Sequence, residues 1–254
     1  MDFASFDGFD WDALRTATRG IMSLARDLRL WVVLGSVHEL TAGKPHSCSY
    51  IIDAGGQLVD RYDKMLCAGD SGETSGDLLH YAADSHFSVF TVNGVRCGVL
   101  ICHDYRYPEL YREYKKRGVQ VIFHAFHAGG IGGERYAAME RYVGRENRYF
   151  GAGSTLPAIT MPAGMIASAS NNYMWISCLN SSAAVSCWPS FFVRPDGVIT
   201  GALPPGETDV LISTADTAAE YYDSTAAWRE RAIDAQYHSE RLVEDARSRS
   251  RTEL

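Results

Sequence analysis

The sequence has no long hydrophobic run and no excess of positive charge. None of its apolar stretches approaches the roughly 20 residues of a membrane-spanning helix, and the first residues, Met-Asp-Phe-Ala-Ser, lack the basic region and apolar core of a signal peptide. The formal net charge of −7 over 254 residues argues against nucleic acid or an anionic membrane as the main partner. We therefore expect a cytoplasmic protein that binds neither.

Cysteine is too sparse for a disulfide framework. The six cysteines are scattered along the chain, whereas disulfide scaffolds carry them at much higher density. Reduced thiols are the simpler interpretation. With 46% hydrophobic and 22% charged residues, the composition is that of an ordinary α/β protein. We treat residues 1–254 as one domain, with residues 240–254 as a C-terminal arm.

Short apolar runs alternate with helical patterns and turn signals. A helix that Asp10 or Asp12 can cap is expected to continue to Leu28, and Leu30–Leu34 indicates a fully buried strand. Further strands are expected at 50–52 and 58–62, 86–92 and 95–101, 119–123, 175–179, 190–193 and 198–200, and 211–213. Further helices are expected at 108–117, around 136–149, from 164 to 171 and near 228. This order predicts a layered α/β fold, with a mixed sheet or a two-sheet sandwich covered by helices.

The stretch Val95–Gln120 places a cysteine between a strand and a helix. Gly98–Ile101 reads as the end of a buried strand, and Pro108 opens a helix that Gly118 closes. The chain therefore leaves the sheet at Cys102, close to backbone N–H groups and to the positive end of a helix dipole. Such a setting lowers the pKa of a thiol and favours a nucleophilic thiolate. The alternative is a cysteine that only fills space in the core.

Two charged residues are candidate partners for Cys102. Lys64 stands where the chain leaves a strand, and Glu73 lies in the Gly- and acid-rich loop 67–77. A lysine beside a thiol favours the thiolate and stabilises an oxyanion, and a carboxylate can carry the proton. Taken singly, each is better explained as a solvated surface charge.

The motifs around these residues resemble those of the carbon–nitrogen hydrolase, or nitrilase, superfamily. They are Asp-Arg-Tyr-Asp-Lys, which ends at Lys64, and Gly-Val-Leu-Ile-Cys-His-Asp-Tyr-Arg-Tyr-Pro-Glu at 98–109. The likeness continues through 30–36, 145–147 and 190–197. It implies a four-layer α-β-β-α sandwich that hydrolyses a non-peptide C–N bond of an amide-type small molecule, without metal or cofactor, as a homodimer or higher homo-oligomer.

The resemblance also implies roles for individual residues. Cys102 is the nucleophile, which forms a thioester with the acyl part of the substrate. Lys64 steadies the tetrahedral intermediate together with the backbone N–H of His103, and Glu73 falls where many members place a second glutamate. The motif residues Asp104, Arg106 and Glu109 are expected to shape the elbow from behind the site.

The sequence departs from the family at its N-terminal side. The family's triad is Glu, Lys and Cys, and its glutamate follows the second strand in a Pro-Glu pair. Relative to the family, the chain lacks the first β-α-β unit, and neither Asp2 nor Asp7 has a setting that supports a substitute. The alternative function is therefore a catalytically impaired member that acts as a binding or structural subunit.

Three histidines distinguish the region after the nucleophile. Many members have tyrosine where this chain has His103, and His124 and His127 follow in the next strand and loop. Together they either bias the pocket towards a polar or acidic substrate, or pack and hydrogen-bond. A metal pair is weaker, because no third ligand is evident. The Gly-rich loop 124–133 lacks the Lys-Ser/Thr of a phosphate-binding loop and suits a lid or a substrate-facing loop. These motifs do not distinguish amide, ureide and nitrile substrates, and amide is the default.

Overall fold

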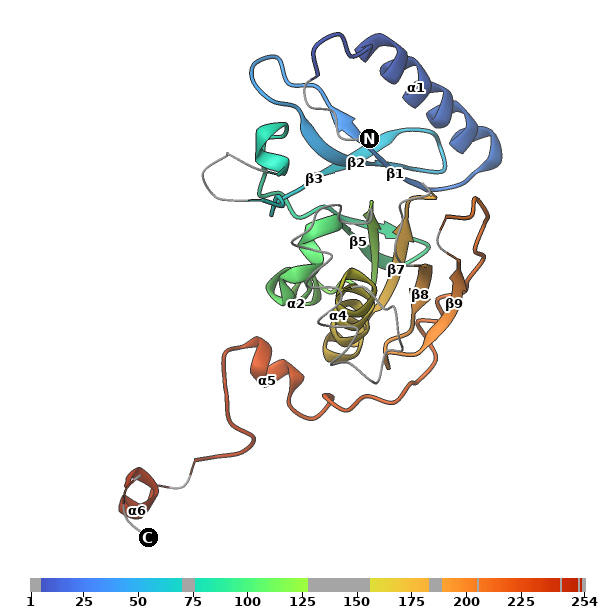
Figure 1. Ribbon diagram of the computed structural model, residues 1–254. Helices are drawn as coiled ribbons and strands as arrows, with labels where there is room; N and C mark the ends of the chain where they lie inside the picture. Colours follow the sequence, from blue (N-terminus) through green and yellow to red (C-terminus); the bar gives the residue numbers. More distant parts are fainter. Residues whose placement is uncertain are drawn as a thin grey trace.

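The protein is described from a computed structural model. The model describes residues 6–69, 76–127, 156–182, 189–204, 206–242, 244–250 and 252. Within these ranges the strands form a three-stranded and a six-stranded sheet. Figure 1 shows helix α1 (Trp11–Leu28) over the smaller sheet, and helices α2 (Pro108–Lys116) and α4 (Leu156–Asn172) beside the larger one. The chain thus has a mixed α/β fold with its layers in the order α-β-β-α.

The smaller sheet is an antiparallel meander of β1 (Val32–His38), β2 (His46–Ile52) and β3 (Leu58–Asp63). The predicted hairpin is confirmed, and the Asp53 carboxylate accepts the backbone N–H groups of its turn. The prediction of a fully buried first strand is wrong, since the side chains of β1 are mostly half-buried. The reason is that β1 has only β2 as a neighbour among the described strands.

The larger sheet has the order β4-β5-β6-β7-β8-β9. Its strands are β4 (Val89–Val92), β5 (Val95–Ile101), β6 (Val121–Phe126), β7 (Trp175–Asn180), β8 (Ser190–Val193) and β9 (Ile199–Leu203). Strands β5, β6 and β7 run parallel, and the outer pairs are antiparallel. The hairpin turn at Asn93-Gly94 is confirmed: its φ values of 50° and 84° suit the left-handed positions of a type I′ turn.

The segment after β9 does not join this sheet, so the prediction of a strand at 211–213 is wrong. Leu211 packs against the core, but Ile212 is 89% exposed. The short apolar run therefore serves one packing contact and no strand pairing. Beyond it the chain extends away from the layers, with the short helices α5 (Arg229–Ile233) and α6 (Ala246–Arg249) (Figure 1). No helix in the described part of the chain is both long and apolar enough to cross a lipid bilayer.

The core lies between the two sheets and continues under the helices. Ile51 of β2 and Tyr62 of β3 pack into the same cluster as Val99 of β5. On the other face of β2, Tyr50 and Ile52 pack with α1. Because successive side chains of a strand point to opposite faces, β2 connects both layers of packing.

Helix α1 begins and ends where the sequence predicts. It begins after Asp10, whose carboxylate accepts the backbone N–H of Ala13 at 2.8 Å, as the capping signal predicts. Helices α2 and α5 also lie where they are expected, whereas α4 begins before its expected start and contains Pro162. The helix expected around 136–149 and residues 128–133 of the expected Gly-rich loop lie outside the described residues. The prediction that this loop begins at 124 is wrong, because residues 124–126 continue strand β6.

Helix α2 packs very closely against β5. A Cβ atom added to Gly98 would lie 2.6 Å from the Tyr114 ring, so only glycine fits there. The Tyr114 hydroxyl donates to the Val99 carbonyl at 2.7 Å. This contact fixes α2 against the strand that leads into Cys102.

Candidate active site

Cys102 occupies a sharp elbow. It follows the last residue of β5 and begins a short 3-10 helix, η2 (Cys102–Arg106). Its φ of 48° lies in the left-handed region, which costs roughly 1–2 kcal/mol for a residue with a Cβ atom. The surroundings must therefore hold this residue in place.

Asp104 is one of the groups that hold the elbow. Its buried carboxylate accepts the Ile101 N–H at 2.9 Å, the Tyr62 hydroxyl at 2.7 Å and the Leu66 N–H at 3.1 Å. Burial raises the pKa of this carboxyl, and the three hydrogen bonds only partly oppose the shift. Asp104 thus ties the elbow to β3 and to the loop that follows β3.

Lys64 lies directly after β3 and is only 3% exposed. Its ammonium forms an ion pair with the carboxylate of Asp77, which also accepts the Ala68 N–H at 2.9 Å. Burial on its own lowers the pKa of Lys64, but the Cys102 thiolate and Asp77 raise it, and the net shift is upward. A fixed positive charge therefore acts on Cys102 at neutral pH.

The pKa of Cys102 itself differs from the sequence-based expectation. Burial raises it, and the opposing effects of Lys64 and of a hydrogen bond from the His127 backbone do not compensate. The prediction that the elbow lowers this pKa is therefore wrong, because desolvation of the thiolate outweighs the nearby charge. The free protein holds mostly the thiol at neutral pH, and reaction requires a group that accepts its proton.

The three histidines lie in different environments. His103 is half-buried beside Tyr107, with its Nδ1 buried and without a hydrogen-bond partner, and burial lowers its pKa. His127 has an exposed side chain and acts on Cys102 through its backbone. His124 is buried in β6 and contacts the Cys102 carbonyl. Among the described residues, no three His, Cys, Asp or Glu side chains are grouped as metal ligands.

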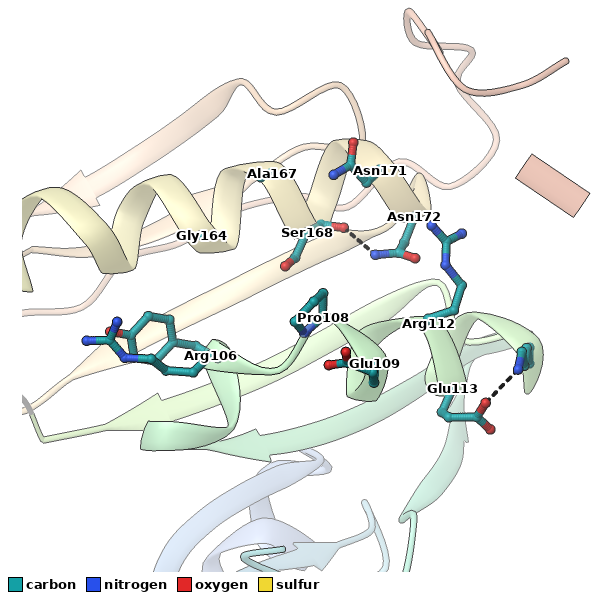
Figure 2. A pocket seen from close by; sticks show the side chains of 12 residues that line it. Arg106, Pro108, Glu109, Arg112, Glu113, Gly164, Ala167, Ser168, Asn171 and Asn172 are labelled. Carbon is teal, nitrogen blue, oxygen red and sulfur yellow. Dashed lines mark hydrogen bonds and ion pairs between the residues drawn. The ribbon is translucent and has the colours of Figure 1, made fainter. Parts of the chain in front are cut away.

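Two of the other expected site residues line a groove whose walls do not include Cys102. Arg106 and Glu109 are exposed and line a groove of about 600 Å³ between α2 and α4 (Figure 2). Glu73 lies outside the described residues. Sequence reasoning missed Asp77 as the partner of Lys64. Its only signal is its place at the end of the acid-rich loop, and an irregular loop has no periodicity from which a contact can be predicted.

The fold and the elbow together define a mixed α/β protein with a cysteine, a lysine and a carboxylate in mutual electrostatic contact. The model of the carbon–nitrogen hydrolase family matches residues 3–225, and the chain belongs to that family.

Individual relatives agree with this assignment. The chain is 28% identical over 122 residues to 2-oxoglutaramate amidase of Bacillus subtilis, covering 48% of this chain and 46% of the relative. It is 26% identical over 109 residues to deaminated glutathione amidase of Yersinia enterocolitica, covering 40% and 38%. The chain thus spans less than half the length of these curated relatives.

The amidase of Nesterenkonia sp. AN1, from the nitrilase superfamily, has a similar fold. The TM-score is 0.58 at 18% identity, with 78% of this chain and 66% of that chain covered. A variant of the amidase has been solved with the acetamide moiety of fluoroacetamide attached covalently to its active-site cysteine.

Proposed function

We propose that the protein hydrolyses the C–N bond of a small amide through a thioester on Cys102. The observation that carries this proposal is the coupling of Cys102 to the buried Lys64 ammonium and the Asp77 carboxylate at a strand-to-helix elbow. A buried cation beside a nucleophile stabilises both the thiolate and a later oxyanion. The amidase names of the curated relatives and the cysteine adduct of the structural relative support the same chemistry.

The acylation step begins with proton transfer from Cys102. Asp77, or Glu73 in the same loop, accepts the thiol proton while the sulfur forms a bond to the amide carbon. The carbonyl oxygen becomes an oxyanion, which the Lys64 ammonium and the His103 N–H stabilise. The C–N bond then breaks as the nitrogen takes the proton and leaves as ammonia or an amine.

Deacylation reverses these roles. Water gives one proton to the carboxylate and adds to the thioester carbon. The C–S bond then breaks, the sulfur recovers the proton and the carboxylic acid is released. The net reaction consumes one amide and one water. It needs neither metal nor cofactor, which makes a short amide the simplest test substrate.

We propose a homodimer as the working form. Size-exclusion chromatography with light scattering measures the mass of the assembly and tests this.

The proposal is tested by intact mass after brief incubation with a panel of short amides, together with assay of released ammonia. We expect a mass gain equal to the acyl group in wild type and in Cys67→Ala, and none in Cys102→Ala. Cys67 is a suitable control because it is also a free, half-buried thiol. Absence of both adduct and ammonia across amides, ureides and nitriles, in folded protein, contradicts the proposal.

The second candidate is a binding or structural subunit without turnover. The raised pKa of Cys102 favours it, because a thiol that is mostly protonated is a poor nucleophile. Binding of a short amide without adduct, seen by calorimetry in both wild type and Cys102→Ala, would support this candidate over the enzyme.

A further inference from the structure

His124 joins three elements at one buried point. Its ring lies in β6, with Nε2 3.1 Å from the Cys102 carbonyl oxygen and Nδ1 3.0 Å from the hydroxyl of Tyr111 on α2. All atoms of His124 and Tyr111 are removed from solvent. A carbonyl oxygen can only accept a hydrogen bond, so Nε2 carries the proton of the neutral ring. Nδ1 then accepts a hydrogen bond from the Tyr111 hydroxyl. Tyr111 thereby fixes the tautomer that donates to Cys102.

His124 holds the carbonyl end of the peptide unit that joins Cys102 to His103. The Cys102 carbonyl and the His103 N–H belong to one planar peptide unit and point in opposite directions. A hydrogen bond that fixes the carbonyl therefore also fixes the direction of the His103 N–H. It also polarises the amide, which makes that N–H a stronger donor. The adjoining left-handed φ of Cys102 gives this peptide an unusual orientation that requires such support.

We propose that His124, held by Tyr111, is a positioning residue that orients the peptide between Cys102 and His103 and so aims the His103 N–H at the substrate oxyanion. The inference rests on the proposed function, because it assumes acyl chemistry at Cys102. His124 itself touches no substrate and transfers no proton. Burial lowers the pKa of His124 to about 3, and Lys64 acts in the same direction, so the ring stays neutral over the working pH range.

Two reagents separate this role from a merely structural one. A p-nitrophenyl ester acylates a thiol through a tetrahedral oxyanion, whereas iodoacetamide alkylates it by displacing iodide without forming one. The ratio of the two rates at Cys102, read by mass spectrometry, therefore reports oxyanion support rather than thiol accessibility. This readout does not depend on amide turnover.

His124→Phe removes the group that donates to the Cys102 carbonyl, and His124→Gln supplies a different donor in its place. Tyr111→Phe keeps the imidazole but removes the hydroxyl that fixes its tautomer. The chain offers a matched control in the smaller sheet, where His38 Nδ1 lies 2.8 Å from the Tyr50 hydroxyl. We expect His124→Phe to lower the ratio about tenfold, a fraction of the effect of losing an oxyanion donor. His124→Gln should stay within about threefold of wild type, because its side-chain amide can donate to a carbonyl.

Tyr111→Phe keeps the ring in place and should lower the ratio about threefold, which tests the idea even if His124→Phe does not fold. His38→Phe and Tyr50→Phe should leave the ratio unchanged. The inference is overturned if His124→Phe lowers the acylation and alkylation rates equally, or if the ratio of the two rates is unchanged in both Tyr111→Phe and His124→Phe. Absence of ester acylation in wild type also overturns it. If the ratio falls as expected but no amide is hydrolysed, the proposed function fails and the positioning role stands.

Discussion

Tyr62 and Tyr114 provide a matched test of what holds the elbow in place. Both side chains are fully buried, and both hydroxyls donate a hydrogen bond of 2.7 Å. The difference lies in the acceptor. Tyr62 donates to the Asp104 carboxylate across the two sheets, whereas Tyr114 donates to the neutral carbonyl of Val99. Replacing each tyrosine by phenylalanine therefore compares a charged with a neutral acceptor at equal burial.

The two substitutions should differ clearly in free energy of unfolding. A hydrogen bond to a neutral group contributes about 0.5–1.5 kcal/mol, and one to a charged group about 1.5–3 kcal/mol. We expect Tyr114→Phe to lie in the first range and Tyr62→Phe in the second. Asp104 keeps its bonds to the Ile101 and Leu66 N–H groups in the Tyr62 variant, so the carboxylate is weakened but not stranded.

The pH dependence gives a second signature. The Tyr62 hydroxyl lowers the pKa of Asp104, against the larger upward effect of burial. Without it the folded-state pKa of Asp104 rises further, so the variant binds its proton more readily and loses stability relative to wild type as pH rises. The cost of Tyr62→Phe should therefore shrink when Asp104 is protonated at acidic pH, and the cost of Tyr114→Phe should stay constant.

Urea unfolding at several pH values, followed by tryptophan fluorescence, measures both costs. The double variant with Asp104→Asn should be less destabilised than the sum of the single changes, because the two residues share one interaction. Equal costs for the two tyrosines, with no pH dependence in either, would refute the conclusion that a charged acceptor fastens the elbow to the smaller sheet.

Three further outcomes follow from the site and its packing. Gly98→Ala should destabilise the fold by about 1–3 kcal/mol in the same urea assay, because its Cβ meets the Tyr114 ring; a neutral result contradicts the close approach. The rate of Cys102 alkylation by iodoacetamide should still rise with pH above the pH at which an ordinary thiol is fully ionised, since burial raises the pKa of Cys102; a rate that levels off at the pH of an ordinary thiol contradicts this. Asp77→Asn should speed that alkylation at neutral pH, because the carboxylate raises the Cys102 pKa, and yet slow amide turnover, because a proton acceptor is lost; parallel changes in both rates contradict this assignment.

Local signals in the sequence were sufficient to place the elbow. Asn93-Gly94 sets the hairpin that delivers β5, and Pro108 and Gly118 bound the helix that follows Cys102. Each of these signals acts within a few residues, through backbone conformations that few residue types adopt. The same local reasoning placed the Asp10 cap and most strands.

The groups that act on Cys102 could not be found in this way. Asp104 meets Tyr62 across 42 positions of sequence, and His124 meets the Cys102 carbonyl across 22. The first contact depends on how the two sheets stack, and the second on which strands pair within the larger sheet; no local spacing rule contains either. The pKa of Cys102 likewise depends on burial, a property of the whole fold, which outweighs the local helix dipole and shifts the pKa upward.

Asp104 and His124 constrain the same residue from its two sides. Asp104 fixes the Ile101 N–H before the nucleophile, and His124 fixes the carbonyl after it. Each is itself held by one tyrosine hydroxyl, Tyr62 or Tyr111. The two tyrosines share no hydrogen-bond partner, but both act on the conformation of Cys102, so their costs in free energy of unfolding should be less than additive.

Their effects on reaction should not be independent. Both constraints serve one strained φ angle, so the first loss already relaxes Cys102 and leaves less for the second to release. We therefore expect the Tyr62→Phe/Tyr111→Phe variant to lose less ester-acylation rate than the product of the two single losses, and less stability than the sum of the two single losses. Stopped-flow acylation and urea unfolding on the same four proteins check both statements. Rate losses that multiply fully would mean that the two hydrogen bonds act on Cys102 separately and that the elbow is not one jointly held conformation.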